Sequence, residues 1–465
     1  MTGRGQSRKI TVLTSAALVA AIVPGWAQQG DAPAASRFTL DLSAGASVDD
    51  NEGLDDPSRG TTSRTNVGAT LRFLDETAVS QLAVSLFTRA EFARSPDDDI
   101  DGFDFRLPTA SIAYTRLGAN SQLSLTARYL FERVDDDVLI FLDEDLNPVD
   151  LILDGGDLRR ITLGGTLSTG IEGPLGFDAG VSFDDRDYIG TTDPDLYDRR
   201  SVGVNAALRF QLSGVLTGRL TGSYSRLDED TFGDPVTETT AYGVGLTYAL
   251  DPITVITGDI AQTTVEETFF DVTTTANEGL AFSLGIQRDL PNGAIGGRIA
   301  RTVEEASTRT LISVNRATDL RDGGIAYSIG YSFSDDGGDD AIIGSLDFTR
   351  ELRTARVSAR LSQQAISDDD GDDTLVTRIA LGYTQDINTV SSFGVDFGLG
   401  RSDNLGAGDD TTTRANLGVN YRRALTRDWD WVLGYEARFL SEDGGDVANS
   451  NRVFTRIDRS FTFRP

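Results

Sequence analysis

The sequence predicts an all-β fold, a transmembrane antiparallel up-and-down β-barrel of about 22 strands, with about 20 or 18 as alternatives if neighbouring segments merge. Three observations predict it. Stretches of alternating apolar and polar residues recur from about residue 37 to residue 463. They divide into an even number of segments, as single-chain bacterial barrels require. The connections between them alternate between tight turns and longer acidic loops, which suits strands that run in opposite directions across a membrane.

The alternation assigns a role to each face of a strand. In 123–131, the apolar residues from Leu123 to Phe131 interleave with Ser124, Thr126 and Arg128, and 429–439 repeats the pattern. Successive side chains of a strand point to opposite faces, so every segment has one apolar face and one polar face. The apolar face is expected to meet lipid, with aromatic residues near the strand ends.

The N-terminus predicts export. Residues 1–27 read as a signal peptide, because Arg4, Arg8 and Lys9 precede a short apolar run that ends in Pro24. Residues 28–36 form a short periplasmic lead, and 37–465 form the barrel. The lead leaves no room for a separate plug domain, which disfavours a siderophore-type receptor. No apolar run is long enough to cross a bilayer as a helix.

The amino-acid composition excludes several classes of function. The chain has no histidine and no cysteine, so it lacks the commonest general base, the commonest transition-metal ligand and any thiol nucleophile. The formal net charge of −30 would repel the phosphates of a nucleic acid. The sequence therefore predicts a non-enzyme with no cofactor and no nucleic-acid partner.

The connections predict an orientation. Tight turns at 118–120, 213–214, 251–252, 291–293 and 426–427 belong on the periplasmic side. Longer acidic loops at 97–101, 135–157, 228–234, 335–340, 368–373 and 442–446 belong outside. The predicted strands are 37–48, 63–73, 79–93, 103–116, 121–133, 159–169, 175–187, 198–211, 215–226, 238–250, 252–265, 277–289, 293–303, 308–318, 323–334, 340–351, 353–366, 374–386, 389–402, 411–424, 428–441 and 450–463. Both termini are then periplasmic.

Arginine recurs on the polar face. A charge facing lipid near the midplane would cost about 2–4 kcal/mol, so these side chains should point into a water-filled lumen. The predicted pore-lining residues are Arg72, Arg89, Arg128, Arg209, Arg219, Arg298, Arg360, Arg378, Arg414 and Arg438. The alternative is that each merely braces the wall by pairing with an acid such as Asp41, Glu91, Asp178, Asp396 or Glu436.

The last strand carries an assembly signal. Val453, Ile457, Phe461 and Phe463 alternate, and Phe461 and Phe463 supply the terminal aromatics. Here the sequence resembles bacterial outer-membrane porins and porin-like barrels, although Arg464 and Pro465 follow the last phenylalanine. The resemblance implies insertion by the barrel-assembly machinery into the outer membrane of a Gram-negative bacterium. Outer-membrane lipid and lipopolysaccharide would then be its surroundings.

The longest outer connection, 134–158, has two readings. The resemblance to porins implies a loop that folds inward and constricts the pore, with Asp143, Glu144 and Asp145 facing wall arginines. The alternative is a hairpin in which 138–142 and 149–153 flank a turn and extend two strands above the membrane.

The acidic loop tips also have two readings. Carboxylates are ligands for Ca²⁺ and Mg²⁺, which could bridge the loops to lipopolysaccharide. The alternative is solvated loops without a metal. The residues concerned are Asp335, Asp336, Asp339, Asp340, Asp368, Asp369 and Asp370.

The predicted function is a porin-like channel for passive diffusion of small hydrophilic solutes or ions. The alternative is an occluded barrel with a structural, adhesive or polysaccharide-export role. A homotrimer would need a flattened apolar outer face, and the sequence does not mark one. A soluble β-sandwich is the competing fold, but it rarely exceeds about ten strands in one domain.

Overall fold

The structure is a computed structural model that describes residues 35–96, 102–133, 156–191, 196–270, 272–304, 307–335, 340–367, 373–404, 411–442 and 447–463. These residues form a single sheet of 22 strands in which all neighbouring strands are antiparallel. Within these ranges no helix is long and apolar enough to cross a membrane.

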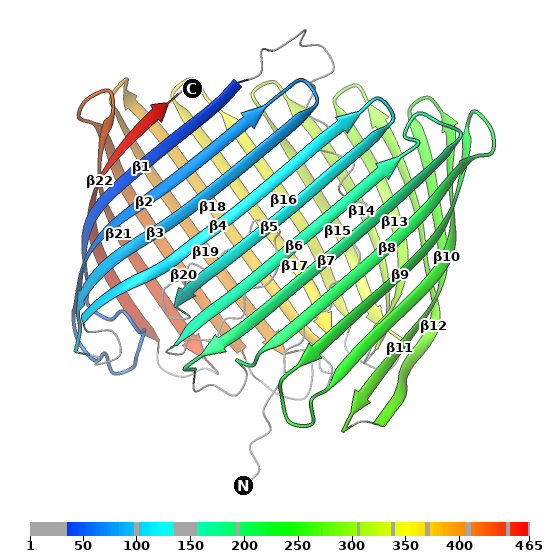
Figure 1. The fold of residues 1–465 in the computed structure, drawn as a ribbon, viewed down its shortest axis with the longest axis horizontal. Coiled ribbons are helices and arrows are strands. Elements are labelled where there is room, and N and C mark those ends of the chain that lie inside the picture. Colours follow the sequence, from blue (N-terminus) through cyan, green and yellow to red (C-terminus); the bar gives the residue numbers. More distant parts are fainter. Residues whose placement is uncertain are drawn as a thin grey trace.

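The strands follow one another around the sheet in chain order (Figure 1). Their bounds are β1 Ala35–Asp49, β2 Thr62–Glu76, β3 Ser80–Arg94, β4 Gly102–Gly118, β5 Ser121–Arg133, β6 Asp157–Thr169, β7 Leu175–Ile189, β8 Arg199–Gln211, β9 Leu216–Glu229, β10 Val236–Asp251, β11 Thr254–Phe269, β12 Val272–Leu290, β13 Gly293–Val303, β14 Thr308–Leu320, β15 Gly323–Ser334, β16 Ala341–Glu351, β17 Ala355–Ser367, β18 Asp373–Asn388, β19 Ser391–Asn404, β20 Thr411–Ala424, β21 Trp429–Glu442 and β22 Ala448–Phe463. The predicted all-β barrel of about 22 strands is confirmed.

The sheet closes because the last strand pairs with the first. Phe38 lies opposite Phe463, and the register continues without a break to Asp49 opposite Arg452. We call this β1–β22 junction the seam. The start of β1 and the end of β22 lie at the same end of the barrel (Figure 1). Closure removes the free sheet edges, which could not be tolerated in hydrocarbon.

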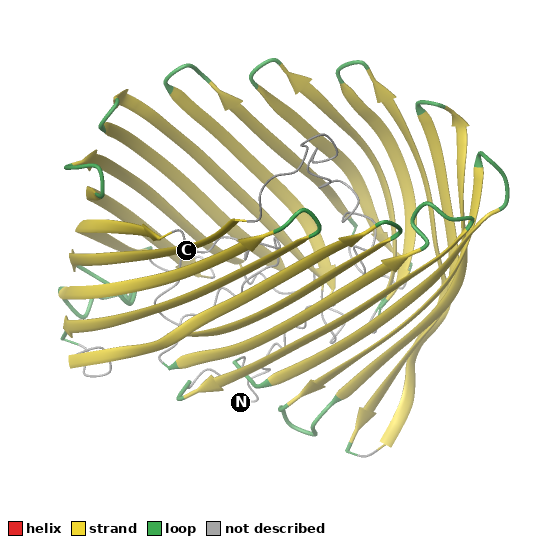
Figure 2. Ribbon diagram, turned by 45° about the horizontal axis from the view of Figure 1, so that its top comes forward, coloured by secondary structure: helices red, strands yellow, loops and turns green. Residues whose placement is uncertain are grey.

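Short turns lie at the end of the barrel where β1 begins and β22 ends (Figure 2). Turn chemistry explains the one between β12 and β13, where Pro291 and Asn292 precede Gly293 with φ +130°. A side chain at Gly293 would overlap the Ala317 carbonyl of the neighbouring strand. By the usual asymmetry of such barrels this short-turn end is periplasmic, and the opposite end is extracellular.

The register separates an apolar outer face from a polar inner face. On β8, Val202, Val204 and Leu208 share one face with Phe210, and their neighbours across β7 are Phe183, Val181 and Phe177. Exposed apolar side chains repeat on this face around the sheet, as with Val67, Leu284, Ile329 and Val453. The buried polar residues Arg64, Glu91, Arg414, Arg438 and Ser450 lie on the other face.

Two strand predictions need correction. The segments 252–265 and 277–289 pair further than predicted, so that Phe269 lies opposite Val272 and the hairpin β11–β12 projects beyond its neighbours (Figure 1). Threonines around Thr273 continue the ladder without apolar alternation, which is why the pattern ended early.

β4 agrees with the predicted strand 103–116 within two residues. An irregularity opposite Phe87–Arg89 moves its apolar phase from Phe103 and Phe105 to Ile112 and Tyr114.

Candidate functional site

The inner wall is the surface on which polar chemistry gathers. The register places all ten predicted arginines on it. Their surroundings divide the wall into two zones, a solvent-exposed zone and a buried cluster at the extracellular end of the seam.

In the exposed zone, arginines pair with acids on neighbouring strands. Arg72 donates to Asp41, Arg209 donates to Asp178, and Arg360 donates to Asp347 at 2.7 Å. The Arg72 and Arg360 side chains keep 60% and 50% of their surface exposed, so these pairs are solvated. Solvated ion pairs contribute little to stability, about 0–1 kcal/mol. Arg128 and Arg298 are also exposed on this face, and neither forms an ion pair within the described residues.

One pair crosses an intervening strand. Arg219 on β9 reaches over β10 to Asp259 on β11, with 2.7 Å between Nε and Oδ1. Gly245 lies directly between them in the register.

The buried cluster lies at the extracellular end of the seam, on β1, β2, β3, β21 and β22. We define this seam cluster as Asp49, Glu52, Arg64, Glu91, Arg438 and Ser450. Arg438 donates to Asp49 at 2.6 Å, and Ser450 donates to the same carboxylate at 2.7 Å. The side chains of Arg438 and Asp49 are only 9% and 5% exposed. A buried charge pair of this kind must be kept intact, because removing one partner leaves the other without compensation.

The connection 50–61 covers the cluster from the extracellular side. Its Glu52 contacts Arg64 at 2.6 Å, and Arg64 also contacts Glu91 on β3. The amide of Asn51 donates to the backbone carbonyl of Asn449 at 2.9 Å, which ties the connection to β22. Leu54 is buried. The first extracellular loop is therefore held against the wall through contacts on both sides of the seam.

The sequence named part of this cluster and missed the rest. Arg438 and Glu91 were expected on the inner wall, whereas Asp49, Glu52, Arg64 and Ser450 were not singled out. The available signal for these residues was closure of the predicted barrel, which places the first and last strands side by side. Arg89 lies beside Glu91 at 3.4 Å, and Arg378 and Arg414 are buried on the same wall with partners of their own.

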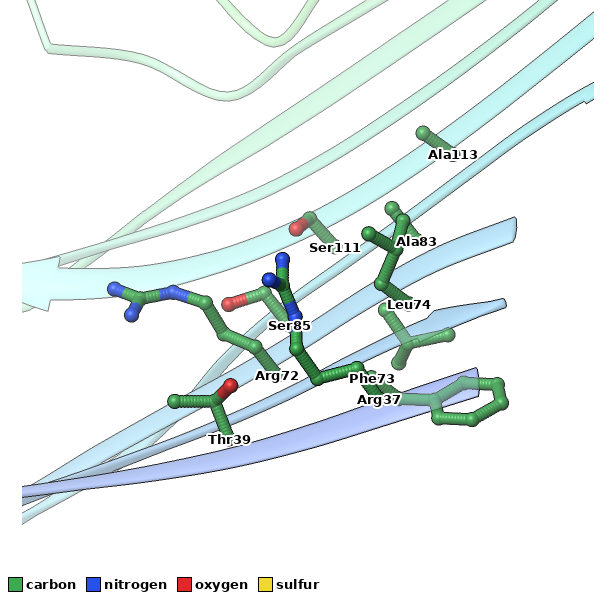
Figure 3. A pocket seen from close by; sticks show the side chains of 10 residues that line it. Arg37, Thr39, Arg72, Phe73, Leu74, Ala83, Ser85, Ser111 and Ala113 are labelled. Carbon is green, nitrogen blue, oxygen red and sulfur yellow. The ribbon is translucent and has the colours of Figure 1, made fainter. Parts of the chain in front are cut away.

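A hollow of about 370 Å³ opens on the inner wall (Figure 3). It lies where β1 begins and β2 ends, near the periplasmic end. Arg37 and Arg72 enter it from β1 and β2, and hydroxyls come from Thr39, Ser85 and Ser111. Its lining combines two guanidinium groups with hydrogen-bonding hydroxyls, a set suited to carboxylate or phosphate groups of a solute.

The predicted loop residues are described only in part. Asp335 pairs with Arg301 at 2.7 Å, and Asp340 accepts a hydrogen bond from Tyr331 at 2.8 Å. Across the described ranges, no three acidic side chains gather closely enough to hold a metal ion. The remaining predicted positions lie outside the described residues: Asp143, Glu144, Asp145, Asp336, Asp339, Asp368, Asp369 and Asp370.

The predicted assembly residues lie at the seam. Phe461 and Phe463 share the outer face with Leu40 and Phe38, which are their partners on β1. Phe463 is exposed.

No family model and no curated protein sequence matches this chain. Solved structures do. The ferric-catecholate import receptor Fiu from E. coli K12 has a TM-score of 0.59 at 9% identity, over 93% of this chain and 82% of that one. The FrpB iron transporter from Neisseria meningitidis has a TM-score of 0.58 at 8% identity, over 93% and 83%. The copper transporter OprC has a TM-score of 0.55 at 12% identity, over 93% and 81%.

At such low identity the likeness concerns the fold. Together with the closed sheet and the apolar outer face, it gives the chain the fold of Gram-negative outer-membrane β-barrels, as the sequence predicted. The neighbours named above are transporters and receptors rather than porins.

Proposed function

We propose that the barrel carries small hydrophilic solutes or ions across the outer membrane through its interior, by passive diffusion. The observation that carries the proposal is the exposed inner wall. Arg72, Arg128, Arg298 and Arg360 reach solvent on the face opposite the lipid. Charged side chains that stay exposed on the inner wall support a water-filled path through the barrel.

Charge would set the selectivity of such a path. Arginine–carboxylate pairs line the exposed zone, and Arg128 and Arg298 add positive charge without an ion-pair partner among the described residues. A lumen lined in this way attracts anionic groups. The hollow beside Arg37 and Arg72 is a site where such groups would bind during passage. The proposal includes no catalytic step.

Planar-bilayer conductance of the purified chain tests the proposal. Stepwise current openings in symmetric KCl are the expected result. Bilayers that stay silent, although heat-modifiable gel mobility shows a folded barrel, would favour the occluded barrel with a structural, adhesive or polysaccharide-export role. The seam cluster and the connection 50–61 that covers it are the observations that support the occluded barrel.

A second candidate is uptake of a metal complex. The fold neighbours support it, because they include an iron transporter, a ferric-catecholate import receptor and a copper transporter. Saturable quenching of tryptophan fluorescence by ferric enterobactin would support this candidate. An unchanged signal, combined with steady ion conductance, would favour diffusion.

A further inference from the structure

Arginines also lie on the outer face, and they behave differently at the two ends of the barrel. Near the extracellular end, five outward arginines pair with outward carboxylates. The pairs are Arg159 with Asp187, Arg200 with Asp185, Arg226 with Asp228, Arg301 with Asp335, and Arg401 with Asp403. Arg94, at the same end, lacks such a partner in the described residues.

Near the periplasmic end, six outward arginines form no ion pair with a carboxylate in the described part of the chain. They are Arg116, Arg288, Arg316, Arg350, Arg423 and Arg459. We call them the rim arginines. Two acids lie at the same level. Asp75 accepts a hydrogen bond from Ser36, and Asp251, whose charge interacts with that of Arg288, accepts one from the backbone amide of Ile253.

The rim arginines lie where a membrane surface would be. Arg116 is opposite Ser80, the first residue of β3, and Arg288 is opposite Thr254, the first residue of β11. Arg459 is opposite Trp429, where β21 begins. All six lie near the periplasmic ends of even-numbered strands, and the outward residues before them are apolar, such as Ile286, Phe348 and Ile457.

Among the rim arginines, Arg459 has two aromatic rings packed against its guanidinium group. Its guanidinium carbon lies 5.0 Å from the centre of the Trp429 ring and 4.2 Å from that of Phe461. Its Nε is buried and has no hydrogen-bond partner within the described residues. Aromatic contacts fix the orientation of the guanidinium plane, and its terminal N–H groups form no hydrogen bond within the described residues.

We propose that the rim arginines bind the phosphodiester headgroups of anionic phospholipids in the periplasmic leaflet, with Arg459 as the principal site. A guanidinium donates two parallel hydrogen bonds to a phosphate, which a lysine cannot do. The ligand is a lipid rather than free phosphate, because the site continues directly into the apolar outer wall at Leu42 and Ile457. The acyl chains of the same lipid would cover that wall.

Tryptophan fluorescence provides the test. The chain has three tryptophans, and with Trp26→Phe in every variant only Trp429 and Trp431 are left, both beside the site. The protein is reconstituted in phosphatidylcholine vesicles, and fluorescence quenching by brominated phosphatidylglycerol is compared with quenching by brominated phosphatidylcholine. We expect a preference for phosphatidylglycerol of about fivefold, the effect of one arginine at a charged surface.

Arg459→Gln should bring this preference close to one, whereas Arg401→Gln, at the extracellular end, should leave it unchanged. Arg423→Gln, beside Trp431, gives a second variant if Arg459→Gln fails to fold. An equal preference in Arg459→Gln and the unmodified chain would overturn the proposal. Displacement of the lipid by millimolar inorganic phosphate at constant ionic strength would also overturn it, by identifying a site for the free anion.

Discussion

Arg219 and Asp259 form an ion pair across a strand to which neither belongs, with 2.7 Å between Arg219 Nε and Asp259 Oδ1. The strand between them contributes Gly245 at the crossing point. An ideal Cβ at Gly245 would overlap both side chains. The pair therefore depends on a residue that takes no part in it.

Gly245→Ala should break this contact. The added methyl group displaces Arg219 from Asp259, and we expect a loss of about 1–3 kcal/mol in the free energy of unfolding. Urea denaturation in lipid vesicles measures it. Gly222→Ala on β9 is the matched control, because nothing lies within 4 Å of its added Cβ. An equal effect of both substitutions would show that backbone entropy, not the pair, decides the outcome.

Arg438→Ala should be among the most destabilising substitutions of the wall. It leaves the buried carboxylate of Asp49 with Ser450 and a backbone amide but no cation, at a cost of about 3–5 kcal/mol. The control is Arg356→Ala in the pair with Glu351, whose side chains are 70% and 67% exposed. That change should cost no more than about 1 kcal/mol. Comparable unfolding midpoints for the two variants would contradict the assigned burial.

The charge of the exposed zone should govern ion selectivity. Replacing Arg128 and Arg298 by Glu reverses two positive charges on the inner wall, so the reversal potential in a KCl gradient should move towards cation preference. The effect should shrink at high salt, where exposed charges are screened. Arg226→Glu alters an outward-facing arginine and serves as control. A shift of the same size in that control would place the selectivity outside the lumen.

The terminal aromatics should matter more for insertion than for stability. Phe463→Ala removes an exposed outer-face ring at the seam, and we expect less folded barrel in the outer membrane, measured as the heat-modifiable fraction of the total protein. Phe210→Ala removes an outer-face ring on β8 and should leave that fraction nearly unchanged. A similar fall in both variants would indicate lost lipid contact in general.

Local patterning was sufficient for most of the fold. Alternation such as that of 123–131 depends only on neighbouring residues, so the number of strands and their two faces could be predicted. It failed where the alternation was interrupted. The apolar phase of β4 changes between Phe105 and Ile112, and alternation alone does not locate the irregularity that accommodates this change, because its position depends on the pairing with β3.

The seam cluster was beyond local reasoning for a similar reason. Asp49 and Arg438 are separated by 389 positions, and only closure of the sheet brings them together. Glu52 and Asn51 belong to a connection without periodicity, so their contacts with Arg64 and Asn449 depend on how the loop lies against the wall. The arginines of the exposed zone were easier to predict, because the polar phase of each strand is enough to place them.

The seam has a consequence for the order of folding. Every strand except the first and the last pairs only with its neighbours in the chain, and those pairings close short loops at little entropic cost. The β1–β22 pairing joins the two ends of the sheet, and its loop-closure entropy favours its forming last. Until then the growing sheet has two open edges that can capture other strands. A long-lived open form would therefore expose the chain to aggregation before the barrel is complete.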